Sequence, residues 1–452
     1  MTEKAQQFII FLGDVALLFL SLYLALTIRH QAIVTAEIWA EHWPTFTWTF
    51  LIWIGVLYIS GVYTISNIRN DIKAFVAATQ IIGINFLLAI TFFYVFPAVQ
   101  LTPKTILGIT TIIFFFLFLA WRRLVYRFTS KTMVKNVLMI GSNNTVTELQ
   151  HILDHNPQYG YRLAAVLTHD ARDGIGNLPD YQDQKQLDTV LKKHDISLIV
   201  LDNESRNSNK LVTNLYQHLN ERLEFVSLTD FYESITKRIS LDTIDQFWFL
   251  ENLQEGEKRF YDALKRLVDI VFAVCFGAIA LALLPFLALL IVISYSGPVF
   301  FTQIRLGKNG KPFRAIKLRP MVPDAEKHGP QWAAKNDPRV TPLGRWLRKL
   351  RLDEIPQLVN IFRGEMSFVG PRPERPEFVK TLEQEIPFYR ERLLVKPGLT
   401  GWAQINYKYG ATTKETIKKL QYDLYYVKNR SLVLDLGIIL KTIKTVLSGA
   451  GQ

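Results

Sequence analysis

Two adjacent carboxylates, Asp353 and Glu354, stand in the arginine-rich stretch RLDEIPQLVNIFRGEMSFVGPRPERPEF at residues 351–378. Neighbouring side chains on a helix project about 100° apart, so this pair cannot flank a glycosidic bond as the acids of a glycosidase do. One carboxylate could attack a substrate or hold Mg²⁺ while the other completes the metal shell. Arg348 and Arg372 flank the acids and could bind phosphate. A solvated helix with internal ion pairs would also explain this stretch alone.

Three further stretches favour the chemical interpretation. The segment GPVFFTQIRLGKNGKPFRAIKLRPM, which carries Lys317, is typical of a β-hairpin that turns at Asn309 and Gly310. The stretch FVGPRPERPEF places Arg372 between two prolines, which stiffen the backbone that presents it. The stretch VKPGLTGWAQINY has the Pro-Gly and Thr-Gly signals of an ordered loop and carries Lys396.

The first 130 residues are predicted to form a bundle of four transmembrane helices. Each apolar stretch has about the 20 residues that a helix needs to cross a core ~30 Å thick. The four stretches are Phe8–Ile28, Phe46–Tyr63, Phe75–Phe96 and Ile106–Leu124. Basic residues gather before the first and after the second and fourth, which places the N-terminus and everything after residue 125 in the cytoplasm. Asp14 interrupts the first stretch, and a side chain facing neighbouring helices is favoured over an ion or lipid site.

The composition points to a membrane protein with an anionic partner. Hydrophobic residues make up 49% of the 452 residues, and the formal net charge is +12. Nucleic acid, anionic lipid and a phosphorylated substrate all fit that charge. The single cysteine, Cys275, excludes an intrachain disulfide and a zinc cluster. The N-terminus shows no small-residue cleavage site after a short apolar core, so a removed signal peptide is not expected.

Residues 136–250 alternate between strand-like and helix-like patterns, as in an open α/β sheet. The first unit, NVLMIGSNNTVTELQHIL, has a glycine turn between its strand and its helix. A dinucleotide loop requires G-x-G-x-x-G, because glycine lets the backbone approach a pyrophosphate. Gly141 is followed by Asn143 and Val146 at the other two positions. A structural or regulatory domain is therefore favoured over a nucleotide-binding one.

The apolar run LVDIVFAVCFGAIALALLPFLALLIVIS at residues 267–294 resembles a fifth span. A continuous helix of this length would be ~42 Å long, more than the core requires. Pro285 lies well inside it, so a kink is expected. Basic residues precede the run and follow it, and a crossing helix would put one cluster on the wrong side. A re-entrant helix that bends near Pro285 is favoured over a crossing helix.

By these motifs the C-terminal part is identified as a member of the polyprenyl-phosphate hexose-1-phosphate transferases, the monotopic phosphoglycosyl transferases. The resemblance extends over about 190 residues. It is carried by KRLVDI, GPVFFTQIRLG, LRLDEIPQL, SFVGPRP, KPGLTGWAQIN and YDLYYVKNRSLVLDL. With its N-terminal spans and degenerate nucleotide fold, the chain is similar to the long form of this family, the undecaprenyl-phosphate galactose phosphotransferases.

The resemblance implies a multidomain membrane protein with three parts. Residues 1–130 would form the four-helix transmembrane bundle, and residues 131–255 a degenerate Rossmann-like α/β domain in the cytoplasm. Residues 256–452 would form an α+β monotopic catalytic domain with a re-entrant helix at 266–294. The protein would lie in the bacterial inner membrane as a multi-pass protein, with the catalytic domain on the cytoplasmic face.

Residue roles follow from the same resemblance. Asp353 matches the nucleophile, which attacks the β-phosphate of a UDP-sugar, expels UMP and carries the phosphosugar until undecaprenyl phosphate takes it. Glu354 matches the second acid of the dyad, with either Mg²⁺ positioning or proton handling as its role, and Asp353 and Glu354 would hold Mg²⁺. The residues expected to bind substrate are Arg348, Arg372, Lys317 and Lys396. The residues expected at the lipid are Lys265, Arg266 and Pro285.

The implied partners are a UDP-sugar, undecaprenyl phosphate and membrane lipids. Two copies of such a membrane domain could also pair as a homodimer. Galactose, glucose and N-acetylated sugars all fit, as do capsule, O-antigen and exopolysaccharide pathways.

Rival functions have less support. A membrane-tethered nucleotide-sugar dehydratase or epimerase needs intact phosphate glycines and a Y-x-x-x-K pair after a strand–helix series. Tyr261 and Lys265 have that spacing but adjoin the apolar run. A membrane scaffold that recruits anionic lipid would leave Asp353, Glu354 and Arg372 without a purpose. Nucleic-acid binding is not expected, because the basic residues cluster beside apolar segments.

Overall fold

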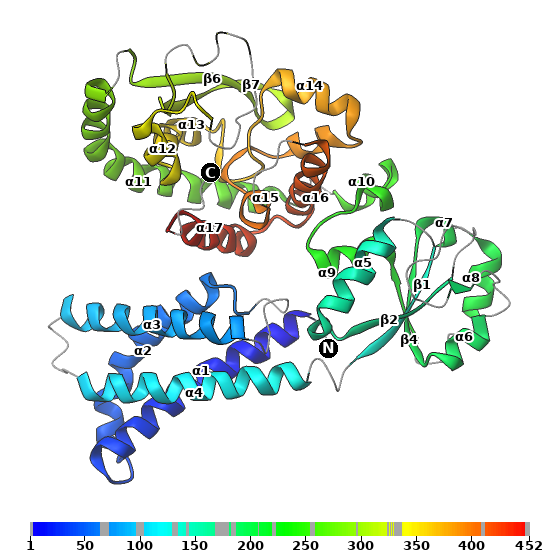
Figure 1. The fold of residues 1–452 in the computed structure, drawn as a ribbon, viewed down its shortest axis with the longest axis horizontal. Coiled ribbons are helices and arrows are strands. Elements are labelled where there is room, and N and C mark those ends of the chain that lie inside the picture. Colours follow the sequence, from blue (N-terminus) through cyan, green and yellow to red (C-terminus); the bar gives the residue numbers. More distant parts are fainter. Residues whose placement is uncertain are drawn as a thin grey trace. The chain divides into compact units, whose positions relative to one another are not determined.

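The computed structural model divides the chain into two compact units, Met1–Leu228 and Thr229–Gln452 (Figure 1). The described residues are 3–63, 72–95, 104–128, 134–141, 144–167, 180–181, 187–206, 208–218, 223–253, 258–294, 297–322, 325, 327, 329, 337–407 and 412–447. Asn143, part of the expected phosphate loop, and Phe96, at the end of the third expected span, lie outside them.

Four long helices open the first unit. They are α1 (Glu3–His30), α2 (Ala36–Ile59), α3 (Ile72–Val95) and α4 (Lys104–Arg127). The second helix begins ten residues before the apolar stretch predicted there, because Thr35 caps it by accepting a hydrogen bond from the Ile38 backbone N–H at 3.4 Å. Trp53, Phe46 and Phe114 are fully buried in the bundle core.

Three of these helices fulfil the expectation for membrane spans. Within the described residues, the helices long and apolar enough to cross a membrane are α1, α3, α4 and, in the second unit, α11 (Arg259–Ser294). Helix α2 is long enough but is not among these four, and it contains His42, Pro44 and several threonines and tryptophans. The bundle is therefore a four-helix bundle of which three helices have clear membrane-spanning character.

Asp14 of α1 has a partner inside the bundle. Its side chain is fully buried and forms an ion pair with the guanidinium of Arg122 from α4, which also lies over the Phe118 ring. A buried charge requires such pairing. The prediction that Asp14 faces neighbouring helices is therefore confirmed.

The rest of the first unit is an α/β domain. Its strands are β1 (Lys135–Ile140), β2 (Tyr161–Leu167), β3 (Asp180–Tyr181), β4 (Ile196–Leu201) and β5 (Glu224–Ser227). Its helices are α5 (Asn144–His155), η3 (Pro157–Tyr159), α6 (Leu187–Lys193), α7 (Asn203–Arg206) and α8 (Asn209–Tyr216). All strands are parallel, in the order β3-β2-β1-β4-β5. One of the two common doubly wound sheets has this order in its first five strands, and Figure 1 shows α5 on one side of the sheet and α6 and α8 on the other.

The turn after β1 is filled by a carboxylate. Gly141 has a φ of +120°, and a Cβ added there would lie 1.9 Å from Oδ2 of Asp202, which follows β4. Glycine is required by this close approach. Asp202 also accepts a hydrogen bond from the Ser205 backbone N–H at 2.8 Å. A carboxylate at the β1–β4 crevice repels phosphate, so the crevice is a poor place for a pyrophosphate.

Within its described residues, the second unit contains one long helix, two pairs of short strands and a series of shorter helices. Before α11 come α9 (Leu228–Thr236), η5 (Leu241–Thr243) and α10 (Gln246–Asn252). The strands are β6 (Phe300–Leu306), β7 (Pro312–Leu318), β8 (Ser367–Val369) and β9 (Gly398–Thr400). The later helices are η7 (Lys308–Gly310), α12 (Pro342–Lys349), η8 (Leu352–Gln357), α13 (Leu358–Arg363), α14 (Pro376–Glu385), η9 (Tyr389–Leu394), α15 (Trp402–Asn406), α16 (Thr413–Asn429) and α17 (Leu432–Leu447).

The β-hairpin predicted around Asn309 and Gly310 is confirmed. Strands β6 and β7 pair antiparallel from Phe300 opposite Leu318 to Leu306 opposite Pro312. Asn309 and Gly310 both adopt positive φ in the connecting turn, a conformation that asparagine and glycine adopt more readily than other residues.

Helix α11 is a single helix of 36 residues with Pro285 inside it. A straight helix of that length would extend about 54 Å. Figure 1 shows that the ribbon instead turns sharply, so that its last part runs across the direction of its first part. A proline inside a helix accounts for such a kink. The kink predicted near Pro285 is therefore present.

Candidate active site

The acid pair lies where the chain changes direction between two helices. Helix α12 begins at the cap formed by Thr341, whose hydroxyl accepts a hydrogen bond from the Gly344 N–H at 2.9 Å. The chain then turns at Arg351, which has a left-handed φ of 54°. Asp353 and Glu354 follow in the 3-10 helix η8 rather than in an α-helix. A left-handed non-glycine residue costs of order 1 kcal/mol or more and is a frequent feature of functional sites.

Glu354 is the anchor of the cluster. Its side chain is only 7% exposed, and its Oε1 accepts hydrogen bonds from Lys317 Nζ at 3.2 Å and Arg372 Nη2 at 3.0 Å. Arg351 Nη1 lies 4.0 Å from the other oxygen, Oε2. The cations come from β7, from the stretch after β8 and from the turn before η8, so Glu354 ties three parts of the fold together.

Asp353 is buried beside Glu354 but is held differently. Burial raises the pKa of the Asp353 carboxyl and the charge of Glu354 raises it further, while Lys317, Arg372 and Arg348 act in the opposite direction. Burial alone would also raise the pKa of Glu354, but Arg372 and Lys317 outweigh it and hold that pKa well below its usual range. Glu354 thus stays ionised, whereas the charge of Asp353 is less well compensated.

Lys317 is positioned by a buried amide that sequence patterns did not reveal. Asn360 of α13 is fully buried. Its Oδ1 accepts a hydrogen bond from the Ile316 N–H at 3.2 Å, and its Nδ2 donates to the Arg314 carbonyl at 2.8 Å. The amide therefore ties the strand that carries Lys317 to the helix that follows the acid pair. A lone Asn in a helical pattern carries no spacing signal that points to a hairpin 44 residues away.

Arg372 is presented by a loop in which two backbones pack directly against each other. Strands β8 and β9 pair in parallel, and the chain that follows β8 stays close to β9: the Gly398 N–H donates to the Pro371 carbonyl at 2.9 Å. A Cβ on Gly370 would lie 2.3 Å from the Lys396 carbonyl oxygen. Glycine is therefore needed at 370 to let the Arg372 loop approach its neighbour.

The structure brings five of the predicted site residues into one cluster. They are Asp353, Glu354, Lys317, Arg348 and Arg372. Four cations, with Arg351 included, surround two carboxylates, so the cluster carries surplus positive charge for an anionic substrate.

Lys396 belongs to a second group, with Arg266. A Cβ added at Gly364 would lie 3.5 Å from Lys396 Nζ and 3.4 Å from the Arg266 guanidinium. The two cations therefore lie next to the same glycine. Burial and the charge of Arg266 lower the pKa of Lys396. Arg266 itself donates hydrogen bonds to the Ile361 and Phe362 carbonyls at the end of α13, at 2.6 and 2.7 Å.

Lys265 lies apart from both groups. Its Nζ is 2.6 Å from Oδ2 of Asp435 in α17, which also accepts a hydrogen bond from Tyr261 at 2.8 Å. The Tyr261–Lys265 spacing that a dehydratase would use thus serves this network. Pro285, on α11, is exposed.

The acid pair offers oxygen ligands suited to Mg²⁺. Oε2 of Glu354 is buried and makes no hydrogen bond with the described residues. The described residues contain no cluster of three or more Asp, Glu, His or Cys side chains that could hold a metal by themselves. Mg²⁺ usually takes one or two carboxylates and completes its shell with water and substrate phosphate. Asp353 and Glu354 therefore fit a Mg²⁺ ion that arrives with a phosphorylated substrate.

Comparison with protein families matches residues 260–449 to the family described as bacterial sugar transferase. This range holds the whole acid and cation cluster.

Among the curated relatives is UDP-N-acetylgalactosamine-undecaprenyl-phosphate N-acetylgalactosaminephosphotransferase of Aeromonas hydrophila, 42% identical over 219 residues, which is 48% of this chain and 51% of that protein. The chain thus matches about half the length of that relative. UDP-glucose:undecaprenyl-phosphate glucose-1-phosphate transferase of Xanthomonas campestris pv. campestris is 33% identical over 330 residues, 70% of this chain and 67% of that protein. The Escherichia coli (strain K12) protein of the same name is 43% identical over 183 residues, which is 40% of this chain and 39% of that protein.

Gly370→Ala tests the packing of the Arg372 loop. We expect a loss of about 1–3 kcal/mol of stability, because the added methyl group overlaps the Lys396 carbonyl and must displace backbone. Thermal unfolding in detergent measures the change. Gly277→Ala in α11 is the matched control, since its added Cβ meets no atom within 4 Å. Equal melting temperatures for the two variants would contradict the packing argument.

Proposed function

Because this chain belongs to the bacterial sugar transferase family, we propose that it transfers a sugar 1-phosphate from a UDP-sugar to undecaprenyl phosphate and releases UMP. The observation that carries the proposal is the buried Asp353, which lies beside an ionised Glu354 and under the influence of three cations. The names of two relatives support undecaprenyl phosphate as the acceptor. One is a transferase of N-acetylgalactosamine phosphate and the other a transferase of glucose 1-phosphate, both with undecaprenyl phosphate.

In the first step a carboxylate oxygen of Asp353 attacks the β-phosphorus of the UDP-sugar. The bond from that phosphorus to the bridging oxygen breaks, and UMP leaves with the oxygen. The sugar phosphate is then held on Asp353 as an acyl phosphate. Arg372, Lys317 and Arg348 stabilise the negative charge that gathers on the phosphate oxygens in the transition state.

In the second step a phosphate oxygen of undecaprenyl phosphate attacks the same phosphorus. The bond to Asp353 breaks, the carboxylate is regenerated, and the product is an undecaprenyl diphosphate sugar. Splitting the transfer into two displacements means that the soluble donor and the lipid acceptor need not be bound together. One cationic cluster can therefore serve both steps.

Mg²⁺, held by Asp353 and Glu354 together with substrate phosphate, would neutralise charge on the diphosphate and its leaving group. Glu354 has a second task that needs no metal. Its ionised carboxylate keeps Lys317 and Arg372 directed at the acid pair.

Asp353→Asn tests the nucleophile. The amide is nearly isosteric but cannot form the acyl phosphate, so we expect loss of UMP release by at least about three orders of magnitude. The assay is UMP formation from a panel of UDP-sugars with undecaprenyl phosphate present. The same panel identifies the sugar. Near-normal turnover by the variant would remove Asp353 from the mechanism.

Glu354→Gln tests metal positioning. We expect lower activity and a weaker response to Mg²⁺, because one anionic ligand and the partner of two cations are lost. The measurement is UMP release as a function of Mg²⁺ concentration in wild type and variant. An unchanged Mg²⁺ dependence would show that Glu354 does not hold the metal.

We further propose that α11 is re-entrant and that the catalytic domain lies on the cytoplasmic face of the bacterial inner membrane. Before the proline, Ala273 packs in a cluster with Phe313 of β7. After the proline, Leu287 and Ile291 pack in a cluster with Leu318 at the other end of β7. Both parts of α11 thus share packed clusters with residues of one seven-residue strand, which supports a helix that returns to the side it came from.

Single cysteines in a Cys275→Ser background test this topology. Phe260→Cys and Lys311→Cys place exposed thiols in the first turn of α11 and after its end, and Ile33→Cys places one between α1 and α2. With a membrane-impermeant maleimide on intact spheroplasts, we expect labelling at 33 only. Labelling at 311 but not at 260 would mean that α11 crosses the bilayer.

The α/β domain is proposed to act as a degenerate Rossmann-like structural or regulatory module. The carboxylate of Asp202 beside Gly141 supports this over nucleotide binding. A homodimer and a place in capsule, O-antigen or exopolysaccharide synthesis also belong to the proposal.

A further inference from the structure

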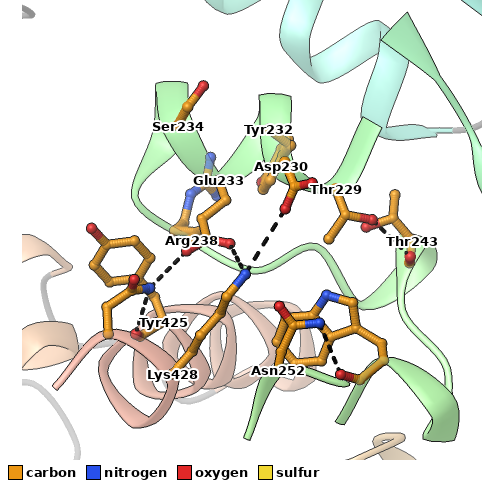
Figure 2. Close-up of polar contacts among 12 residues, drawn as sticks. Thr229, Asp230, Tyr232, Glu233, Ser234, Arg238, Thr243, Asn252, Tyr425 and Lys428 are labelled. Atoms are coloured by element: carbon orange, nitrogen blue, oxygen red, sulfur yellow. Dashed lines mark hydrogen bonds and ion pairs between the residues drawn. The ribbon is translucent and has the colours of Figure 1, made fainter. Parts of the chain in front are cut away.

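The segment at residues 229–253, here named the strap, precedes the family match at residue 260 yet packs on the C-terminal helices. Lys428 of α16 makes its polar connection. As Figure 2 shows, the Lys428 ammonium reaches up to α9, where it lies 2.8 Å from Glu233 Oε2 and 3.9 Å from Asp230 Oδ1. The other oxygen of Glu233 accepts a hydrogen bond from Asn429 at 2.6 Å.

The strap also contributes apolar core. Ile239, Ile244 and Trp248 are at most 8% exposed and share a cluster with residues of α14, η9 and α16, among them Tyr389 and Leu424. The buried face of the strap therefore continues the core of the domain that carries the acid pair.

Two hydrogen bonds connect the strap with α16 and with α15. The Ile239 N–H donates to the Gln421 carbonyl at 3.1 Å, and the Trp402 indole N–H donates to the Lys237 carbonyl at 3.0 Å. Helix α16 is thus held by the strap along residues 421–429.

The same stretch of α16 carries Asp423, which belongs to a buried ion pair. Arg392 of η9 contacts Asp423 Oδ2 through Nε at 3.0 Å and through Nη2 at 2.8 Å, and donates to the Tyr389 hydroxyl at 3.1 Å. Both charged side chains are at most 6% exposed. This Arg392–Asp423 pair is named the clamp.

The clamp ends at the active site. Nη2 of Arg392 donates a hydrogen bond to the backbone carbonyl of Arg372 at 2.9 Å. The guanidinium of Arg372 in turn contacts Glu354. A guanidinium that binds a carboxylate and a carbonyl together fixes both, because its donors have rigid geometry.

We propose that the strap is part of the transferase unit, and that Glu233 and the clamp are positioning residues that hold Arg372 against the acid pair. The path runs from Glu233 to Lys428, along α16 to Asp423, through Arg392 to the carbonyl of Arg372. None of these groups touches the acid pair, so they act through Arg372. The proposal rests on the proposed function only in assigning Arg372 to the donor phosphates.

Glu233→Gln in the full chain tests the strap. The change keeps the shape of the side chain and removes the charge that pairs with Lys428. We expect faster amide hydrogen exchange in residues 370–375 and 389–394. We also expect KM for the UDP-sugar to rise about threefold to tenfold with a smaller change in kcat, as for coupling through a packed network. Glu251→Gln, at an exposed position of the strap, is the matched control.

The clamp is tested by replacing both charges together, as Arg392→Met with Asp423→Leu. A single replacement would leave a lone buried charge, whereas an apolar pair can fold. We expect KM for the UDP-sugar to rise about tenfold or more, and little further loss when Arg372→Ala is added. Tyr389→Phe, which removes only the hydroxyl that Arg392 contacts, is a milder second variant, expected to accelerate exchange at 370–375.

The outcomes separate this inference from the proposed function. If wild type releases no UMP from any UDP-sugar, the proposed function fails, while hydrogen exchange still decides whether the strap and the clamp hold the Arg372 loop. Unchanged exchange at residues 370–375 in Glu233→Gln and Tyr389→Phe would overturn the inference. Additive losses from the clamp and Arg372 variants would also overturn it, because the clamp would then act independently of Arg372.

Discussion

Two neighbouring carboxylates repel each other, and burial strengthens that repulsion by removing the water that would screen it. In this protein the repulsion is resolved unequally. Glu354 takes the hydrogen bonds of Lys317 and Arg372, so its charge is compensated. Asp353 lies under the influence of the same cations, but burial and its neighbour act against its charge. The hairpin, the 3-10 turn and the Arg372 loop are all arranged around this difference.

The surrounding fold supplies rigidity from groups that never reach the acid pair. Asn360 ties the hairpin to α13, the glycine contact at 370 lets two backbones meet, and Arg392 holds the Arg372 carbonyl. Cations gathered without such support would spread apart by mutual repulsion. The buried network therefore sets the positions of the cations, of which the Lys317 and Arg372 side chains are partly exposed.

Sequence reasoning located the acid pair and the cations around it because charge, proline and turn signals are local. The hairpin at Asn309 and the kink near Pro285 were predictable for the same reason. The 3-10 form of η8 was not, because it depends on the left-handed turn at Arg351. Arg392 and Asp423 gave no signal, since they are 31 residues apart and each resembles an ordinary charged surface residue. Likewise, the Thr35 cap moved the start of α2 away from its apolar stretch.

The ion pair between Asp14 and Arg122 has a consequence for biogenesis. The two residues are 108 positions apart, so α1 is synthesised and inserted long before its partner helix exists. An ionised aspartate within an isolated membrane helix costs up to about 2.5–3.5 kcal/mol when it lies near the helix centre. Until α4 emerges from the ribosome, the Asp14 carboxylate has no Arg122 to pair with. It therefore has to be shielded from lipid by the insertion machinery or be protonated. We therefore expect α1 to pack in its final position only after α4 has been synthesised, late in the assembly of the bundle.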